Sequence, residues 1–278
     1  NLCERFYMKS LVGLCCALLL IACDAPKHEQ GGNKLVVCTT GMIADLAANI
    51  GGQRIDVTGL MGPGVDPHYY KASQGDIKRL SDADLILYNG LFLEGKMEEI
   101  FNKMARKKKV VAVSSLIPHE QLRKPPEFKG HHDPHIWFDV SLWQQTIDLV
   151  VTSLSELDPA GAQDFERRGQ AYATRLDSLH RWVGKQIEQV DPGRRVLVTA
   201  HDAFGYFGRA YNIEVLGLQG ISTVAEYGVH DVSRLVDLIV ERQVKAIFVE
   251  SSVPQRSINA VREGCLARNH DVKIGGTL

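Results

Sequence analysis

The segment that decides the fold is the run AGAQDFERRGQAYATRLDSLHRWVGKQIEQV, residues 160–190. Apolar side chains such as Leu179 and Ile187 recur along it at helical spacing for roughly eight turns. The run follows Asp158-Pro159 and stops at Asp191-Pro192-Gly193, since proline and glycine end helices. Such length is unusual for a helix in a globular protein. It predicts a stiff helix joining two structural halves, and an ordinary crossover helix within one large sheet is the alternative.

Short apolar runs alternate with amphipathic stretches on both sides of this segment, which is typical of parallel sheets flanked by helices. In the first half, strands are expected at residues 34–39, 56–61, 85–89 and 110–113, and helices at 42–50, 73–80, 95–103 and 140–157. In the second half, strands are expected at 195–199, 213–218, 246–250 and 272–274, and helices at 203–211, 231–242 and 255–269. The pattern predicts an α/β fold with two lobes, each with a parallel-type sheet of about four strands, joined by one long spine helix.

The boundaries of the lobes follow from these elements. We expect an N-terminal α/β lobe at 34–157, a linking helix at 158–192 and a C-terminal α/β lobe at 193–278. The sequence stops at Gly275-Gly276-Thr277-Leu278, directly after a strand, where a β-α lobe would continue with a helix. We therefore interpret the C-terminal lobe as incomplete.

The first residues are typical of a leader that directs secretion. Met8-Lys9-Ser10 precedes an apolar stretch, residues 11–22, that is too short to span a bilayer comfortably. The stretch ends in Leu20-Ile21-Ala22-Cys23, which resembles the lipobox of bacterial lipoproteins. We interpret residues 1–23 as a signal peptide with lipobox, Cys23 as the site of lipid attachment and 24–33 as a tether. A plain signal peptide cut elsewhere is the alternative.

Composition narrows the class of protein. Hydrophobic residues make up 45% and charged residues 23% of the chain, as in soluble globular proteins. The formal net charge of −1 argues against nucleic acid as a partner, because phosphate binding needs a concentrated excess of Lys and Arg. Beyond the leader only Cys38 and Cys265 remain, and neither belongs to a C-x-x-C pair, so no cysteine zinc site or redox motif is expected.

Three segments each carry a histidine just past an expected strand or a long loop. They are GPGVDPH (62–68), HHDPHIWFD (131–139) and TAHDAF (199–204), and the histidines concerned are His68, His135 and His201. Ligand sites in open α/β sheets collect at such positions. Neutral imidazole is a common ligand for borderline metals. Together the three histidines predict a shared metal site.

Ligating histidines usually need a second group that orients the ring. Each of the three histidines has an aspartate within two residues, namely Asp66, Asp133 and Asp202. We expect these aspartates to orient the histidine rings. Glu250, at the end of an expected strand, is a further candidate neighbour of the site. Three imidazoles with an oxygen donor suit Zn²⁺, and also Mn²⁺ where more carboxylate is supplied. The adjacent His131 and His132 are a weak candidate for collecting metal at a mobile loop.

The motifs VDPH (65–68), DPHIWFD (133–139) and VTAHDAFGY (198–206) resemble the three metal-ligand motifs of the TroA-like solute-binding lipoproteins of zinc and manganese ABC importers. The similarity extends from about residue 34 to 278 and includes GLQGIST (217–223) and FVESS (248–252). This resemblance implies two lobes joined by one long helix, with the metal in the cleft between them. It assigns His68 and His135 to the first lobe and His201 to the second.

The resemblance also implies a fourth ligand, an aspartate shortly after the Gly-Gly-x-Leu segment that ends at Leu278. This carboxylate is therefore expected beyond Leu278. The implied partners are a membrane permease and its ATPase, with the membrane reached through the lipid anchor. The implied location is the periplasm or the cell surface, after secretion across the cytoplasmic membrane, and the expected state is a monomer.

We therefore predict an extracytoplasmic binding protein that captures Zn²⁺ or Mn²⁺ as a transported ligand, without enzymatic activity. The alternatives are a surface adhesin, which is compatible with a lipid anchor, and a metal-dependent hydrolase with a zinc-bound water. A hydrolase is disfavoured because the sequence contains no H-E-x-x-H, no Gly-x-Ser-x-Gly and no phosphate loop.

Overall fold

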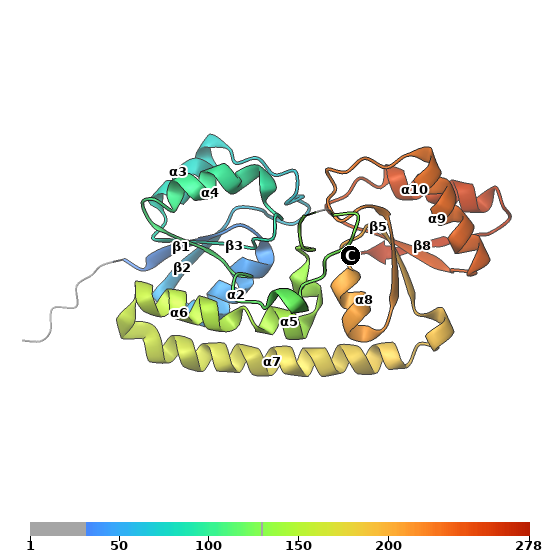
Figure 1. Cartoon of the computed structure of the whole chain (residues 1–278). Helices are drawn as coiled ribbons and strands as arrows, with labels where there is room; N and C mark the ends of the chain where they lie inside the picture. The colour runs from blue at the N-terminus through green and yellow to red at the C-terminus, as the bar shows by residue number, and fades with distance from the viewer. Residues whose placement is uncertain (1–31, 129) are drawn as a thin grey trace, which may run out of the picture. The chain divides into compact units, whose positions relative to one another are not determined.

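The computed structural model describes residues 32–128 and 130–278. The leader, Cys23 and residues 24–31 of the predicted tether lie outside the described residues. The first half contains the strands β1 (Lys34–Cys38), β2 (Ile55–Gly59), β3 (Leu85–Tyr88) and β4 (Lys109–Ala112). They form a parallel sheet in the order β2-β1-β3-β4 (Figure 1). Its helices are α2 (Gly41–Gly51), α3 (Gln74–Asp82) and α4 (Glu98–Met104).

Both faces of this sheet are covered, because successive side chains of a strand point to opposite faces. Val36 and Leu85 pack with α2, while their neighbours Val37 and Ile86 pack with α3 and α4 on the other face. All four side chains are fully buried. The near-continuous apolar runs predicted as strands are therefore strands of a doubly covered parallel sheet.

The stretch predicted as one helix at 140–157 is two helices, α5 (Val140–Gln144) and α6 (Ile147–Leu157). At the break, the hydroxyl of Thr146 donates a hydrogen bond to the carbonyl of Trp143, 2.7 Å away. Threonine hydroxyls compete with helical hydrogen bonding in this way, which gives a physical reason for the interruption. The continuous helix predicted at 140–157 was thus wrong at this point.

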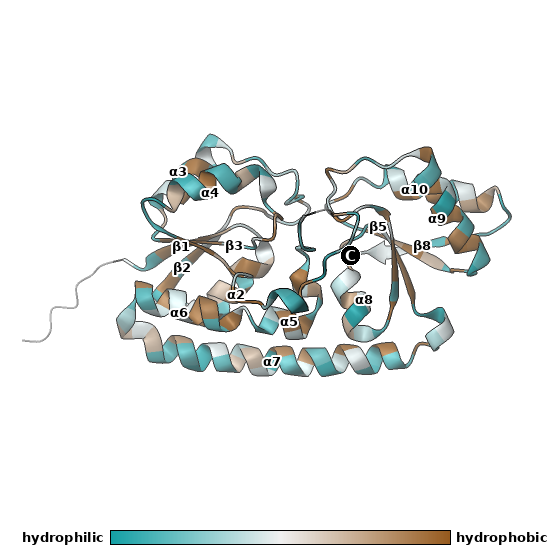
Figure 2. Ribbon diagram, in the orientation of Figure 1, coloured by the Kyte–Doolittle hydropathy of each residue, from teal (hydrophilic) through white to brown (hydrophobic). Residues whose placement is uncertain are grey.

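The long helix predicted from the sequence is present as α7 (Ala162–Glu188), 27 residues long. Its buried residues are Phe165, Gly169, Tyr172 and Leu176, and they contact the helices of the first half. Further along, Nδ1 of His180 lies 3.0 Å from the hydroxyl of Tyr211 in α8 (Gly205–Tyr211) of the second half. Figure 2 shows apolar residues concentrated on the strands and many hydrophilic residues along α7. The helix therefore contacts both halves.

The second half contains the strands β5 (Val196–His201), β6 (Glu214–Gln219), β7 (Ala246–Val249) and β8 (Lys273–Thr277), with α9 (Val229–Glu241) and α10 (Arg256–Leu266). The strands pair in parallel, β5 with β6 and β7 with β8. β5 and β7 lie side by side without a hydrogen-bonded ladder, so the four expected strands form two pairs and not one continuous sheet. At the end of β5 the backbone N–H of His201 donates instead to the Glu250 side chain, at 3.1 Å.

The second half has a hydrophobic core of its own, formed by residues such as Val198, Leu235, Ile247 and Val261. The chain is thus an α/β protein with two sheet-containing halves and a long helix, as the sequence predicted. Among the residues the structure describes, no helix combines the length and the apolar character needed to cross a bilayer.

Candidate metal centre

Each of the three predicted histidines is held at the end of a different local structure. His68 follows β2 on a loop whose turn is closed by a hydrogen bond from the N–H of Val65 to the carbonyl of Gly62, at 3.2 Å. Gly64 has φ +78° in this turn, a conformation that favours glycine. His135 directly precedes a short 3-10 helix, Ile136–Phe138, and His201 is the last residue of β5.

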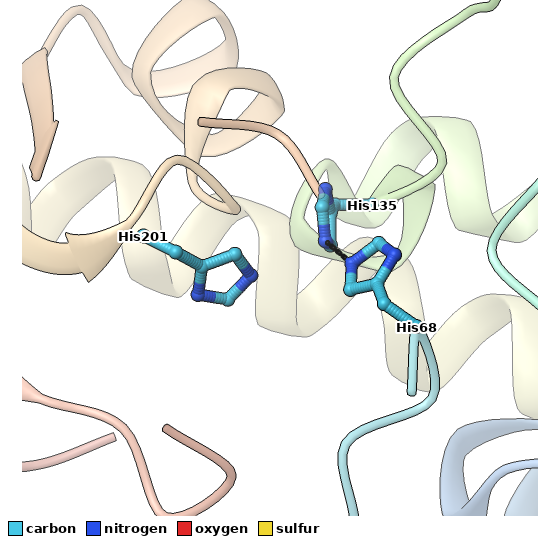
Figure 3. Close-up of side chains that lie close together, drawn as sticks. All are labelled: His68, His135 and His201. Atoms are coloured by element: carbon cyan, nitrogen blue, oxygen red, sulfur yellow. Dashed lines mark hydrogen bonds between the residues drawn. The ribbon is translucent and has the colours of Figure 1, made fainter. Parts of the chain in front are cut away.

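The structure brings the three histidines together in the interior. Nε2 of His68 lies 3.2 Å from Nε2 of His135. The ring centroids are 5.2 Å apart for His68 and His135, 5.3 Å for His135 and His201, and 6.1 Å for His68 and His201. One ring nitrogen from each side chain lies within 4.8 Å of the other two, a spacing that a single metal ion can bridge. Figure 3 shows His201 approaching from β5 and the other two rings lying opposite it.

All three rings are removed from solvent, with exposed fractions of 4% for His68, 2% for His135 and 6% for His201. Burial, together with the neighbouring His135 and His201, lowers the pKa of His68 to about 2. The His68 imidazole is therefore neutral at physiological pH. A neutral imidazole keeps a lone pair for a metal ion.

Two of the histidines are oriented by buried carboxylates. The Nδ1–H of His135 donates to Oδ1 of Asp133 at 2.8 Å, and Oδ2 of Asp133 pairs with the guanidinium of Arg123. Because Asp133 holds the proton on Nδ1, the Nε2 lone pair of His135 faces His68. Glu250 contacts Nδ1 of His201 through Oε2 and accepts the His201 backbone N–H through Oε1. The two imidazoles are thereby fixed in direction.

The contacts of the Asp66 and Asp202 carboxylates differ from those expected from the sequence. Oδ1 of Asp66 accepts the backbone N–H of His68 at 2.9 Å, so it fixes the main chain and not the ring. Among the described residues, the Asp202 carboxylate makes no hydrogen bond with His201, and the adjacent contact comes from Glu250. Asp202 instead lines a neighbouring cavity of about 850 Å³ with His68, and burial raises the pKa of Asp202.

A second cavity, of about 410 Å³, is lined by all three histidines together with Glu250 and Leu278. Leu278 is held there by hydrogen bonds with β7 and the residues after it, from its N–H to the carbonyl of Val249 at 2.8 Å and from the N–H of Ser251 to its own carbonyl at 3.3 Å. Leu278, the last residue of the sequence given, therefore lies beside the histidine centre.

His131 and His132 lie outside the histidine centre. The ring of His131 stacks on Phe92 with centroids 4.3 Å apart. Nδ1 of His132 lies 3.3 Å from the carbonyl of Arg123, and its ring meets that of His119 at 5.2 Å.

Sequence reasoning missed Arg123 and Tyr206 as parts of the centre's support. The Tyr206 hydroxyl donates to the carbonyl of Asp133 at 2.9 Å and accepts the N–H of Arg123 at 3.0 Å. Tyr206 comes from α8 of the second half, whereas Arg123 and Asp133 belong to the first. The only sequence signal for Tyr206 was its place within the motif VTAHDAFGY, and Arg123 carried none.

The chain has two α/β halves, a long helix that contacts both, and three buried imidazoles from both halves that could hold a metal ion. These features define the class as a two-lobed metal-binding protein. Comparison with known proteins makes the class specific: the model of the family "ZnuA: Zinc-uptake complex component A periplasmic" matches residues 36–272. The chain belongs to this family.

Individual relatives agree over most of their length. The chain is 50% identical over 243 residues to the manganese-binding lipoprotein MntA of Bacillus subtilis, covering 87% of this chain and 79% of that protein. It is also 50% identical over 247 residues to the zinc-binding protein TroA of Treponema pallidum, covering 89% and 80%. The solved structure of the periplasmic zinc-binding protein TroA from Treponema pallidum superposes with a TM-score of 0.86, covering 89% of this chain and 88% of that structure.

Proposed function

We propose that this chain is the extracytoplasmic substrate-binding protein of an ABC importer and that it carries Zn²⁺ or Mn²⁺ to a membrane permease. The observation that carries the proposal is the buried set formed by His68, His135 and His201, in which one ring nitrogen of each residue lies within 4.8 Å of the other two. In this proposal all three are metal ligands. Asp133 and Glu250 orient two of the rings, and Asp66 holds the backbone of His68.

The ligand type favours Zn²⁺. Three imidazoles match the nitrogen-rich coordination of zinc, whereas Mn²⁺ prefers more oxygen. The relatives named for zinc and for manganese resemble this chain equally, at 50% identity each. The ligand chemistry, and not the degree of similarity, is therefore the reason for placing Zn²⁺ first. An aspartate supplied shortly after Leu278 is the proposed fourth ligand.

The transport role involves capture and release without making or breaking covalent bonds. We propose lobes at residues 34–157 and 193–278 linked by 158–192, with ligands from both lobes enclosing the ion. A stiff linking helix favours a small tilt of one lobe over a wide hinge motion. The proposed partners are the permease and its ATPase, and the proposed working state is a monomer.

Lipid attachment at Cys23 would keep the loaded protein beside the membrane, at the cell surface or in the periplasm. This part of the proposal is supported by the lipobox-like Leu20-Ile21-Ala22-Cys23 and by relatives that are named lipoproteins. Labelling cells with a radioactive fatty acid tests it. Wild-type protein should carry the label and a Cys23→Ala variant should not.

Metal analysis of the protein purified from its native host tests the central proposal. Wild type should retain close to one Zn²⁺ or Mn²⁺ per chain, and a variant with His68, His135 and His201 all changed to glutamine should retain none. In cells, the triple variant should fail to support growth when transition metals are scarce. Retention of no transition metal by the wild type would contradict the proposal. A triple variant that keeps metal uptake but loses adhesion would favour the surface-adhesin alternative. One that keeps metal uptake but loses a hydrolytic activity would favour the hydrolase.

A further inference from the structure

Beyond the groups that contact the histidine rings, a hydrogen bond joins the two halves next to His68. The hydroxyl of Thr223, in the second half, donates to Oδ2 of Asp66, in the first half, at 2.6 Å. Oδ1 of the same carboxylate accepts the backbone N–H of His68 at 2.9 Å. Asp66 therefore transmits the position of Thr223 to the main chain of His68.

Thr223 is in turn fixed relative to His201. Gln219 is the partner of His201 in the β5-β6 ladder, and its carbonyl accepts the N–H of Asp202 at 2.9 Å. The side-chain amide of Gln219 donates to the carbonyl of Thr223 and, at 2.6 Å, to that of Ala225. A rigid strand end thus holds the loop on which Thr223 lies. We call Gln219, Thr223 and Asp66 the cross-half arc.

The arc connects His68 with His201, the two histidines at the widest edge of the histidine triangle. The ring centroids of His68 and His201 are 6.1 Å apart, against 5.3 Å for His135 and His201. On the side of the narrower edge, between His135 and His201, a hydrogen bond from the Tyr206 hydroxyl to the carbonyl of Asp133 already joins the two halves. Since zinc holds imidazole nitrogens at about 2.0–2.1 Å, small changes along the wider edge alter how well the three ligands fit one ion.

The Thr223–Asp66 bond is suited to this role. Thr223 is only 4% exposed, so water competes little for its hydroxyl. Hydrogen bonds to an ionised carboxylate are shorter and stronger than those between neutral groups. Loss of the Thr223 hydroxyl would leave Oδ2 of Asp66 without its hydrogen-bond donor and would loosen the loop that carries His68.

We propose that the cross-half arc sets the separation of His68 and His201, so that Thr223 is a positioning residue that controls how tightly and how long the metal is held. This inference rests on the proposed function. Release would then involve breaking the Thr223–Asp66 hydrogen bond, which frees the His68 loop while the Tyr206 contact keeps the halves together. Nothing in this step requires Thr223 to touch the ion.

Thr223→Val tests the proposal because valine keeps the shape and lacks only the hydroxyl. Zn²⁺ dissociation is measured by stopped-flow transfer to a chromogenic chelator, with Co²⁺ absorption as a report on ligand geometry. Thr223→Val should release Zn²⁺ roughly tenfold faster, the lower end of the losses seen when groups supporting a metal ligand are removed, and should change the Co²⁺ spectrum. Thr223→Ser keeps the hydroxyl, so its Zn²⁺ release rate and its Co²⁺ spectrum should both match those of the wild type.

Ser222→Ala is the matched control. Within residues 32–128 and 130–278, the one hydrogen bond of the Ser222 hydroxyl is with the N–H of Val224 in the same loop, at 3.3 Å, so its loss should leave zinc release unchanged. The melting temperature of each metal-free variant reports on folding. If Thr223→Val lowers the melting temperature, Gln219→Met is used in its place. This variant removes the side-chain amide that holds the loop, and it should also speed zinc release.

Wild-type release rates and Co²⁺ spectra in Thr223→Val would overturn the proposal, as would a Thr223→Ser variant that behaves like valine. Equal acceleration by Ser222→Ala would also overturn it, because loop disturbance would then be the cause. Failure of the proposed function has a different signature, since wild type itself would then bind neither Zn²⁺ nor Co²⁺.

Discussion

Nε2 of His68 lies 3.2 Å from Nε2 of His135, although the two residues are 67 positions apart in the chain. At this distance inside the protein, a proton added to His68 would place its charge beside two other imidazoles in a poorly hydrated site. Burial and these neighbours accordingly lower the pKa of His68 to about 2. The geometry that prepares a ligand for a cation thus also makes the metal-free protein sensitive to acid.

The first prediction concerns the stability of the metal-free protein at low pH. An unfolded chain takes up a proton at His68 near pH 6.5, whereas the folded protein takes it up only near pH 2. Stability from neutral His68 is therefore present above pH 6.5 and is lost progressively as the pH falls below it. At pH 5 the loss should be about 2 kcal/mol, from 1.5 pH units at about 1.4 kcal/mol each.

Urea unfolding with chelator present, at pH 7.5 and at pH 5, measures this loss. His68→Gln carries no titrating ring, so its stability should fall less than that of wild type over the same interval. Equal pH dependence of the two proteins would exclude His68 as a source of the effect.

The second prediction concerns the carboxylates beside the rings. Asp133→Asn and Glu250→Gln should each weaken zinc binding about 10–100-fold, because each removes the charge that orients a ligating imidazole. Asp202→Asn is the matched control, since its carboxylate makes no hydrogen bond with His201 among the described residues. Competition titration against a chelator of known affinity provides the comparison. A loss in Asp202→Asn equal to that in Glu250→Gln would show that Glu250 has no special role.

The strand pattern and the three histidines could be predicted from the sequence for one physical reason. Parallel strands are buried on both faces and read as apolar runs, and their carboxyl ends gather at one edge, where His201 ends β5. Local pattern also sufficed for α7, because its apolar positions repeat at helical spacing over 27 residues.

Contacts between the halves could not be predicted in this way. Tyr206 reaches the backbone of Arg123 across 83 positions, and Thr223 reaches Asp66 across 157. Such pairs depend on how two separately folded halves meet, which no local periodicity records. The choice between Asp202 and Glu250 beside His201 is similar. Asp202 is adjacent in sequence, but Glu250 follows the neighbouring strand β7 and is adjacent in space.

The third prediction concerns α7. Gly184 lies inside this helix with nothing within 4 Å of the position a Cβ would take, so Gly184→Ala should stabilise the protein by about 0.5–1 kcal/mol through reduced freedom of the unfolded chain. Gly169 lies in the same helix, but a Cβ there would come 2.6 Å from Cγ2 of Val151. Gly169→Ala should therefore destabilise. Thermal unfolding of both variants checks the pair, and the same sign of change in both would contradict the assignment of exposed and packed faces.

The fourth prediction concerns Gly217 in β6, where the backbone packs against that of His201 and Asp202. A Cβ on Gly217 would lie 2.5 Å from the nitrogen of Asp202 and 2.8 Å from the carbonyl carbon of His201, and these backbone atoms cannot turn away as a side-chain end can. Gly217→Ala should therefore cost about 1–3 kcal/mol of stability, typical of overpacking, and should displace His201.

A displaced His201 should lower zinc affinity together with stability, because one ligand then sits away from the other two. Gly220→Ala is the matched control three residues on, where the nearest atom to a Cβ, that of Ala225, lies 3.9 Å away. Urea unfolding and zinc titration of both variants separate the effects. A Gly217→Ala protein that unfolds and binds zinc like wild type would show that β5 and β6 can separate without moving the ligand, and that the close approach of the two strands is not what positions His201.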